Sequence, residues 1–464
     1  MEQETVLHIE GTVEQVLYRN EQNGYTVLDL DANGTLITVV GELGDVEEGE
    51  QLSVDGTYVN HVRFGVQFQA QYVERKLPED AINIQRYLSS GVIKGIGSAL
   101  AKKIVTAFGS QTLEIMEKQP TRLMEIRGIS PKKCEAIAQE VQKIFALRSL
   151  MLFLQQYNIR SRYAMRAYQC YGSGAKEMIL ANPYLLCGMG IELPFEKAEI
   201  LADDLKVPKN AEQRILAGTC YILEHNTHNG YTCLPLDRLQ PKVCEYLQVS
   251  ESEFLSAYQA AQKEGNLVSY QKETREFVYL PAYYEAEQYI ADRIGVLRDF
   301  SAPEDQEIYL DLIKREETEQ GIQYAELQRK AILSALSRGL LILTGGPGTG
   351  KTTTLNGMIS LFEKQGYQVM LAAPTGRAAQ RISDLTGYEA KTIHRLLEVE
   401  FDMAGATKFR HNESNPLTCD VMIVDEMSMV DVLLFESLLR ALRFSCKLIM
   451  VGDSDQLPSV GAGN

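Results

Sequence analysis

The stretch that decides the fold is LILTGGPGTGKTTT, which runs from Leu341 to Thr354. It begins as an apolar run, breaks into glycines and ends in Gly350-Lys351-Thr352, so it has the full GxxxxGK[ST] spacing of a phosphate-binding loop. The glycines let the backbone turn its N–H groups inward, and a helix that begins at Lys351 would point its positive dipole end at a phosphate. The pattern predicts a buried strand, a phosphate-binding loop and a helix, which together start an α/β domain. The alternative is a glycine-rich strand-to-helix turn that binds nothing.

The loop predicts ATP and Mg²⁺ as cofactors. We expect the Lys351 side chain to reach the β- and γ-phosphates, and the Thr352 hydroxyl to be a ligand of Mg²⁺. Upstream, Gln328 lies in a predicted helix, where its side-chain amide could bind the adenine edge. The residues predicted to bind the nucleotide are Gln328, Gly346, Pro347, Gly348, Thr349, Gly350, Lys351, Thr352 and Thr353.

Further apolar runs end in polar residues, as parallel strands do at the ligand-binding edge of an α/β sheet. The runs and the residues that follow them are 369–373 with Pro374-Thr375-Gly376, 421–424 with Asp425-Glu426, and 448–451 with the loop that holds Gln456. Asp425 would hold Mg²⁺ through its water shell, Glu426 would be the general base for the attacking water, and Gln456 would contact the γ-phosphate. With Lys351, these are the predicted catalytic residues. Any one run could be an ordinary core strand, but the set in this order indicates a nucleotide-driven motor.

Length and charge limit the remaining possibilities. The chain has 464 residues and a formal net charge of −16 at pH 7. A single core rarely grows beyond about 300 residues, so the length predicts several domains. The negative charge argues against a bulk polyanion binder, so contacts with nucleic acid must come from local basic loops and backbone N–H groups. The 8 cysteines include no CxxC pair, and no signal peptide or long apolar run is visible, so we expect a cytoplasmic protein with scattered buried thiols.

Residues 1–78 alternate between short strand patterns and turn signals. The predicted strands are Val6–Val13, Tyr25–Leu30, Leu36–Gly41, Gln51–Tyr58 and Val66–Tyr72, with turns at Asn23-Gly24 and Asn33-Gly34. About five strands are what a small OB-like barrel needs, and such barrels often bind oligonucleotides. Because the visible surface residues are largely acidic, docking on neighbouring elements or on a protein partner is the equal alternative.

Residues 79–208 are predicted to be helical, with two glycine turns that each open an amphipathic helix. These turns resemble helix-hairpin-helix motifs, in which backbone N–H groups meet a DNA phosphate and nearby lysines add attraction. The residues expected to contact DNA there are Gly95, Gly97, Lys102, Gly128 and Lys132. Weaker copies of the motif follow at residues 158–163 and 187–192. In the copy at 187–192, an inserted acid and a proline put contact with a phosphate in doubt. The alternative is a pair of helical connectors that only stack on each other.

Residues 209–300 show helical patterns and then a hairpin, a combination consistent with a winged-helix-like unit. Composition alone does not indicate that this unit touches DNA. Two polar, acidic stretches, Ser301–Asp305 and Arg315–Glu319, are interpreted as the linker into the motor. The motor domain itself is placed at 301–464, with a hairpin insertion at about 398–416.

Taken together, the motor motifs resemble those of superfamily-one helicases. The strings that carry the resemblance are GGPGTGKTTT at 345–354, APTGRAA at 373–379, TIHRLL at 392–397, VDEMSM at 424–429 and GDSDQLPSVG at 452–461. They are similar to the RecD/TraA family. The barrel and the helix-hairpin-helix repeats further resemble its long-N-terminus RecD-like branch, which acts without RecB and RecC partners, and the resemblance covers nearly the whole chain.

The resemblance implies a path for single-stranded DNA across the motor domain. The residues implied for this path are Pro374, Thr375, Arg377, Thr392, His394 and Arg395. It also implies 5′-to-3′ translocation and a duplex-splitting pin at residues 399–410, for which a plain surface hairpin is the alternative. Members of the family continue into a second RecA-like domain that completes the γ-phosphate site. We therefore expect a chain that ends at Asn464 to be an N-terminal fragment that does not unwind DNA by itself.

These observations predict a multidomain ATP-dependent DNA helicase that acts in repair or recombination. The expected partners are single-stranded DNA, junctions between single and double strands, and a protein that binds the barrel; the expected state is a monomer. One alternative is a P-loop ATPase in which ATP only switches the grip on DNA. The other is a DNA-binding adaptor with an inert ATP site.

Overall fold

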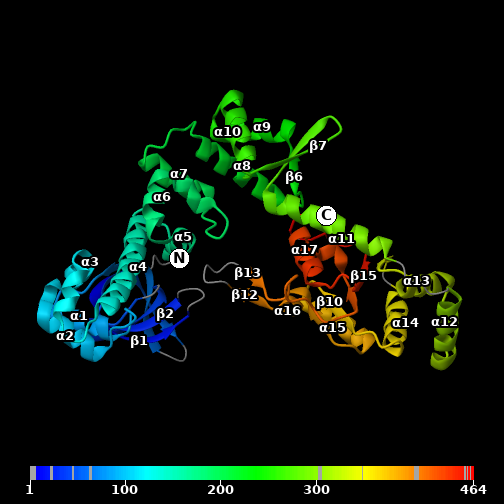
Figure 1. Cartoon of the computed structure of the whole chain (residues 1–464), viewed down its shortest axis with the longest axis horizontal. Coiled ribbons are helices and arrows are strands. Elements are labelled where there is room, and N and C mark those ends of the chain that lie inside the picture. Colours follow the sequence, from blue (N-terminus) through cyan, green and yellow to red (C-terminus); the bar gives the residue numbers. More distant parts are fainter. Residues whose placement is uncertain are drawn as a thin grey trace. The chain divides into compact units, whose positions relative to one another are not determined.

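The computed structural model describes residues 7–20, 25–43, 46–61, 65–300, 306–346, 348–401, 407–453, 456, 458–459 and 461–463. The chain divides into two compact units that join between Lys206 and Val207, and each is considered by itself (Figure 1). The N-terminal unit contains a β-barrel and a helical region, and the C-terminal unit contains a winged-helix fold and an α/β domain. This confirms the predicted fold class, whereas the predicted boundaries of the individual domains stay a prediction.

The N-terminal barrel is closed, as the sequence predicts. Its strands are β1 (Leu7–Arg19), β2 (Tyr25–Ala32), β3 (Thr35–Glu42), β4 (Gln51–His61) and β5 (Gly65–Lys76), in the order β1-β2-β3-β5-β4. Inward-facing side chains such as Leu28 and Phe68 are fully buried, because side chains alternate between the two faces of a strand. The predicted turn at Asn33-Gly34 has φ of 55° and 86°, as a tight hairpin requires, and Asn23-Gly24 lies outside the described residues.

Helices joined by short turns form the rest of the N-terminal unit. They are α1 (Ala81–Ser89), α2 (Ser98–Phe108), η1 (Gly109–Gln111), α3 (Thr112–Lys118), η2 (Pro120–Glu125), α4 (Pro131–Gln155), α5 (Ser161–Tyr171), η3 (Gly172–Gly174), α6 (Ala175–Ala181), η4 (Pro183–Cys187) and α7 (Phe195–Asp204). The turns before α2, α4, α5 and α7 each contain a residue with positive φ: Gly95 (94°), Gly128 (110°), Asn158 (55°) and Gly190 (86°). The residue after each of them is a buried isoleucine, so the predicted weaker copies repeat the geometry of the first two turns.

The barrel is docked on these helices. Glu50 is completely buried and accepts hydrogen bonds of 2.7 and 2.9 Å from the Arg75 guanidinium. Arg148 of α4 lies 3.7 Å from the same carboxylate and donates to the Arg75 carbonyl oxygen at 2.8 Å. A Cβ on Gly49 would lie 2.6 Å from a backbone oxygen of α1, so only glycine allows this approach. These contacts support the docking interpretation of the barrel.

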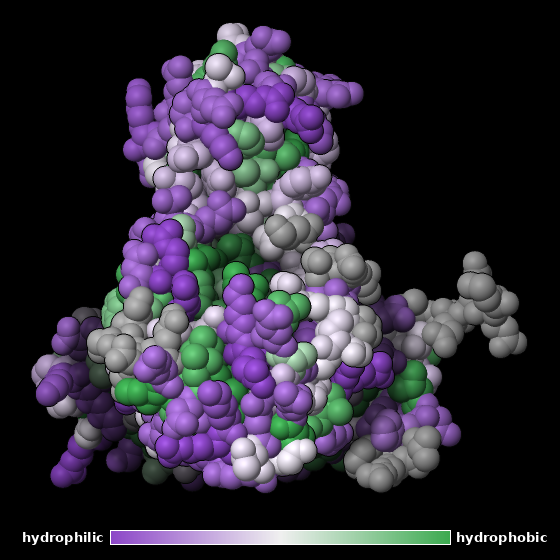
Figure 2. Space-filling model, turned by 90° about the vertical axis from the view of Figure 1, so that its right-hand side faces the viewer, coloured by the Kyte–Doolittle hydropathy of each residue, from purple (hydrophilic) through white to green (hydrophobic). Residues whose placement is uncertain are grey.

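The C-terminal unit starts with the winged-helix fold that the sequence predicts. Helices α8 (Glu212–Thr227), α9 (Leu236–Leu247) and α10 (Glu251–Lys263) accompany a 3-stranded sheet of β6 (Cys233–Pro235), β8 (Arg275–Tyr279) and β7 (Val268–Lys272). The first turn of α10 is acidic, and hydrophilic side chains cover most of this upper part of the molecule in Figure 2. The acidic first turn of α10 is unsuited to contact with the phosphate backbone of DNA.

The α/β domain is built on a 5-stranded parallel sheet with the order β11-β10-β14-β15-β9. Its strands are β9 (Leu340–Thr344), β10 (Val369–Ala373), β11 (Ala390–Thr392), β14 (Val421–Val424) and β15 (Lys447–Gly452). The surrounding elements are α11 (Pro281–Asp299), α12 (Gln306–Gln320), α13 (Glu326–Ser337), α14 (Lys351–Lys364), α15 (Gly376–Thr386), α16 (Ile393–Leu397), β12 (Val399–Phe401), β13 (Thr407–Phe409), η5 (Met427–Met429) and α17 (Val432–Ala441). All the predicted motor strands are therefore confirmed, and β15 separates the P-loop strand from the strand that directly precedes Asp425.

The predicted linker is wrong for residues 315–319, which lie in α12, while residues 301–305 lie outside the described part of the chain. Tyr309 of α12 is buried in the core that α12 shares with α13 and α14. Glu316 is also buried, and the ammonium of Lys364 on α14, 2.6 Å away, compensates the charge of its carboxylate. The charge run that suggested a solvated connection instead belongs to a helix packed on the motor domain.

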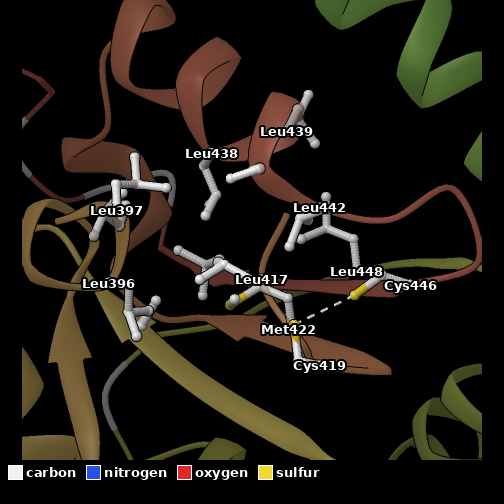
Figure 3. Packing of buried hydrophobic residues seen from close by; sticks show 14 of the residues in the cluster. Leu396, Leu397, Leu417, Cys419, Met422, Leu438, Leu439, Leu442, Cys446 and Leu448 are labelled. Carbon is white, nitrogen blue, oxygen red and sulfur yellow. Dashed lines mark hydrogen bonds between the residues drawn. The ribbon is translucent and has the colours of Figure 1, made fainter. Parts of the chain in front are cut away.

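One half of the motor core lies between the sheet and α17. Leu438 and Leu439 of α17 and Met422 of β14, which are labelled in Figure 3, belong to this core and are fully buried. The thiols of Cys419 and Cys446 meet in the same core, with 3.7 Å between their Sγ atoms. Two of the cysteines that look scattered in the sequence are thus neighbours in space.

Within the described ranges, no helix combines the length and the apolar character needed to cross a membrane. The same residues contain no group of 3 or more His, Cys, Asp or Glu side chains arranged to hold a metal ion.

Candidate nucleotide site and DNA path

The P-loop has the backbone geometry that the motif predicts. Gly348 and Gly350 have φ of 77° and 84°, which L-amino acids with a Cβ rarely adopt. Gly350 is the N-cap of α14, so the helix begins at Lys351 with its free N–H groups at the loop. Pro347, which we also predicted to bind nucleotide, lies outside the described residues.

The side chains of the loop are held by backbone carbonyls. The Lys351 ammonium donates to the Gly345 carbonyl oxygen, so it lies across the mouth of the loop. The Thr349 hydroxyl donates to the Gly346 carbonyl oxygen at 2.9 Å. Thr352 lies half-buried in the first turn of α14, where its hydroxyl can be a ligand of a cation near the loop.

Gln328 lies beside this loop, although it is 22 residues away in the sequence. Its side-chain oxygen accepts from the Ala325 N–H at 2.9 Å, which caps α13, and its amide nitrogen is 3.4 Å from the Gly350 carbonyl oxygen. A Cβ on Gly350 would come within 2.5 Å of the Gln328 amide nitrogen. The structure thus places Gln328 at the nucleotide loop, and its contact with adenine stays a prediction.

Asp425 and Glu426 follow β14, next to the P-loop region. Burial raises the pKa of Asp425 above the usual aspartate range, and the charges of Lys351 and Arg381 oppose that rise. Glu426 has φ of 54°, and its carboxylate lies 3.5 Å from the Arg381 guanidinium. A nearby cation stabilises the charged form of a buried carboxylate. Asp425 and Thr352 offer the hard oxygen ligands that Mg²⁺ prefers, so these two side chains fit this ion.

Gln456 lies beyond the end of β15. Its backbone N–H donates to the Asp453 carbonyl oxygen at 3.2 Å, and its side chain is exposed. Since β15 lies between β9 and β14, the loop after β15 starts between the P-loop and Asp425. The predicted contact between Gln456 and the γ-phosphate remains a prediction.

The residues implied for the DNA path meet because β10 and β11 are parallel neighbours, with Ala373 opposite Thr392. Pro374, Thr375 and Arg377 therefore lie beside Thr392, His394 and Arg395. The hydroxyls of Thr375 and Thr392 accept N–H bonds of 3.2 Å and cap α15 and α16. The two threonines thus fix the start of each helix at this edge of the sheet.

A polar pocket of 650 Å³ opens beside these helices. Arg395 is the only residue of the implied path among its lining residues. Sequence reasoning missed the others, which are Gln380, Ser383, Asp384, Gly387, Tyr388, Glu389, Ala390 and Lys391. Their grouping depends on the pairing of β10 with β11, and no motif marks it.

The predicted hairpin is confirmed by the antiparallel pairing of β12 with β13, and its turn at 402–406 lies outside the described residues. The ring of Phe409 in β13 lies 5.9 Å from the ring of His394 in α16. Arg410 and Glu398 close the base of the hairpin with an ion pair of 2.8 Å. The base of the hairpin is therefore anchored on the element that carries two residues of the implied DNA path.

In the N-terminal unit, the two glycine turns are open to solvent. A Cβ on Gly97 or Gly128 would meet no atom within 4 Å. Lys102 and Lys132 are exposed, and neither forms an ion pair with another described residue. Open N–H groups with free lysines nearby are suited to a phosphate backbone.

Comparison with known proteins agrees with this arrangement. Residues 6–78 match the family described as ATP-dependent DNA helicase YrrC, OB-fold domain, and residues 143–233 match the ATP-dependent RecD2 DNA helicase HHH domain. Residues 86–143 match a SAM-like helix-hairpin-helix tandem, and residues 328–462 match an AAA domain. The ATP-dependent RecD2 DNA helicase of Deinococcus radiodurans is 29% identical over 98% of this chain.

The chain is therefore similar to RecD-like helicases along nearly its whole length. It spans 65% of the length of the Deinococcus relative. RecBCD enzyme subunit RecD of Mycolicibacterium smegmatis is 44% identical over 30% of this chain and 29% of its own length. The solved structure of Pif1 helicase from Candida albicans aligns with 28% identity over 30% of this chain and 34% of its own, at a TM-score of 0.24, which is too low to support an argument.

Proposed function

We propose that this protein is an ATP-dependent DNA helicase that moves 5′ to 3′ on single-stranded DNA. One observation carries the proposal. The carboxyl ends of β9, β14, β10 and β11 bring the P-loop, Asp425-Glu426 and the implied DNA path together at one edge of the sheet. Phosphate chemistry next to a polynucleotide path is what a translocating motor needs.

The proposed chemistry assigns one task to each residue. Lys351 and the N–H groups of the loop bind the phosphates, and Glu426 accepts a proton from the attacking water. Thr352 and Asp425 would hold Mg²⁺, which when bound neutralises charge on the β- and γ-phosphates. Gln456 contacts the γ-phosphate. When the γ-phosphate is cleaved, the change in this contact alters the loop after β15.

The DNA contacts are proposed in two places. Thr375, Arg377, Thr392 and Arg395 bind the single strand on the motor, and the helix-hairpin-helix turns at Gly97 and Gly128 bind backbone phosphates without sequence preference. The hairpin anchored by Phe409 is the pin that separates the duplex. A role in DNA repair, a cytoplasmic location and a monomeric state complete the proposal.

Nucleotide binding is tested first. A fluorescent ATP analogue with Mg²⁺ should bind residues 1–464, and Lys351→Ala should weaken binding by at least tenfold, about 1.4 kcal/mol. Gln365→Ala, a change beyond the end of α14, is the control and should bind as the wild type does. Equal affinity of the wild type and Lys351→Ala would remove the P-loop from the proposal.

Unwinding is tested on the whole protein as the cell makes it. It should displace the strand of a duplex with a 5′ single-stranded tail and leave a 3′-tailed or blunt duplex intact. Glu426→Gln should retain ATP binding and lose turnover, because an amide cannot accept the proton of water. DNA-stimulated hydrolysis without strand displacement would instead favour the ATPase that only switches its grip.

A further inference from the structure

We propose that Arg381 binds either Glu426 or a phosphate of the bound DNA strand, so that DNA releases the carboxylate that acts as general base. The inference rests on the proposed function and deepens it. It makes Arg381 a DNA-binding residue and a positioning residue for Glu426. Neither the P-loop motif nor the strings that carry the family resemblance include Arg381.

The contact with Glu426 is direct and loose. The Arg381 guanidinium lies 3.5 Å from the Glu426 carboxylate, and 67% of the arginine side chain is exposed compared with 16% of the glutamate. A pair at this distance with one solvated partner is weak, because water screens it and the long side chain loses entropy. Arg381 can therefore leave Glu426 at little cost when a stronger acceptor arrives.

Helix α15 brings Arg381 to the DNA path. Ala379 and Ile382 are its buried positions, which fix the rotation of the helix on the sheet. Arg377 and Arg381 are four residues apart and both exposed, so they occupy one face of the helix. Arg377 is implied to contact the strand next to Thr375, the N-cap of α15. One turn further on, the same face reaches Glu426.

A phosphate is the competing acceptor that this geometry selects. Guanidinium groups bind phosphate in a planar, two-bond arrangement, which is stronger than a single contact with a carboxylate at 3.5 Å. The nearby acid on α15, Asp384, is already engaged, since it accepts a hydrogen bond of 2.7 Å from Gln380. Glu426 is thus the carboxylate that Arg381 gives up when it turns to the strand.

The exchange links two sites by thermodynamics. If Glu426 and a DNA phosphate compete for Arg381, then neutralising Glu426 must strengthen DNA binding, because the arginine no longer has to be withdrawn from a partner. The reciprocal effect is that bound DNA frees Glu426 for water. The first effect can be measured without hydrolysis, so it does not depend on turnover.

The test is a double-mutant cycle on DNA affinity, with a fluorescein-labelled oligothymidylate of about twenty nucleotides as the probe. Glu426→Gln should bind about fivefold more tightly than the wild type, and Arg381→Ala should bind more weakly with a smaller dependence on salt. In the Arg381→Ala background, Glu426→Gln should have no effect. Arg381→Lys should restore part of the affinity, because it keeps the charge but not the two-bond geometry.

Arg315→Ala is the matched control. Arg315 is an exposed arginine of the same unit that pairs with Asp311 and not with Glu426. Glu426→Gln should therefore tighten DNA binding in the Arg315→Ala background as much as in the wild type. Equal tightening with and without Arg381 would overturn the inference and leave the proposed function standing. Failure of the wild type to bind the oligonucleotide would overturn both.

Discussion

Replacing Gly357 with alanine is expected to destabilise the motor domain, although alanine is the better helix former. Gly357 lies inside α14, the helix that begins at the P-loop, and is buried. A Cβ at this position would lie 2.3 Å from the Tyr324 hydroxyl oxygen and 2.8 Å from its ring carbon Cζ. Tyr324 is itself buried in the core between α12, α13 and α14, so its ring cannot simply turn away.

Two opposing terms set the magnitude. Alanine in place of glycine stabilises a helix interior by about 1 kcal/mol. Forcing a methyl group into a packed core costs about 1–3 kcal/mol, and a contact of 2.3 Å is far inside the ordinary separation, so the upper part of this range applies. The net loss should be about 1–2 kcal/mol.

Tyr324→Phe supplies the matched background. The hydroxyl of Tyr324 has no hydrogen-bond partner among the described residues, so its removal should cost little or stabilise the core. It also removes the nearest atom to the new methyl group, which leaves the ring carbon at 2.8 Å and Ile332 at 3.2 Å. Gly357→Ala should therefore be better tolerated in the Tyr324→Phe background than in the wild type, with a coupling of about 1 kcal/mol.

Hydrogen exchange measured by mass spectrometry on peptides from α14 is the appropriate assay, because it reports local stability within the whole chain. A loss of about 1–2 kcal/mol corresponds to exchange that is about 5–30 times faster. Affinity for the fluorescent ATP analogue should fall in parallel, since α14 carries Lys351. Slower exchange in Gly357→Ala, or the same change in both backgrounds, would show that Tyr324 does not limit this position.

Three further outcomes are expected. Lys447→Met should lower the free energy of unfolding of the motor domain by about 3 kcal/mol, measured in urea. The buried Lys447 ammonium donates to carbonyl oxygens at the end of α13, two of them at 2.8 Å, and methionine leaves these oxygens without a donor. Unchanged stability would contradict this prediction. Ser250→Ala should destabilise α10 by about 1 kcal/mol, because it removes the capping box, and hydrogen exchange of the first amides of α10 measures this loss. The control Ser252→Ala should have little effect on the same amides. The Asp55 carboxylate accepts a hydrogen bond of 2.6 Å from His8 and raises the pKa of the imidazole, so this pair should stabilise the barrel below the ordinary histidine pKa and lose its effect as pH rises through the raised pKa. NMR titration should show the raised pKa of His8, and Asp55→Asn should lower it.

The sequence predicted those parts of the site that depend on residues close together in the chain. Gly350-Lys351-Thr352 specifies a loop and a helix start within a few residues, and Asp425-Glu426 directly follows an apolar strand. The meeting of Thr375 with Thr392 could also be predicted, because parallel strands place their carboxyl ends at one edge. In each case a local rule fixes the position of the side chain.

Contacts between distant segments could not be predicted in this way. The acidic stretch before the motor resembled a linker because its sequence does not show that Glu316 pairs with Lys364, 48 residues further on. This ion pair is what makes burial of the Glu316 carboxylate tolerable. Arg381 carries no motif, and its role depends on the tertiary packing that sets α15 beside the end of β14. Cys419 and Cys446 likewise meet only through the pairing of β14 with β15.

The position of α15 explains why coupling between ATP and DNA would pass through side chains and not through the sheet. The Asp425 N–H donates to the Ala372 carbonyl oxygen at 2.9 Å, and the next residue of β10, Ala373, pairs with Thr392. These hydrogen bonds join the proposed nucleotide site rigidly to the proposed DNA path, and close-packed strands such as these transmit strain but offer no second arrangement. A switch needs an element with two states. Arg381, mostly exposed and held by a single loose contact with Glu426, is a group at this edge that can change partner without moving a strand.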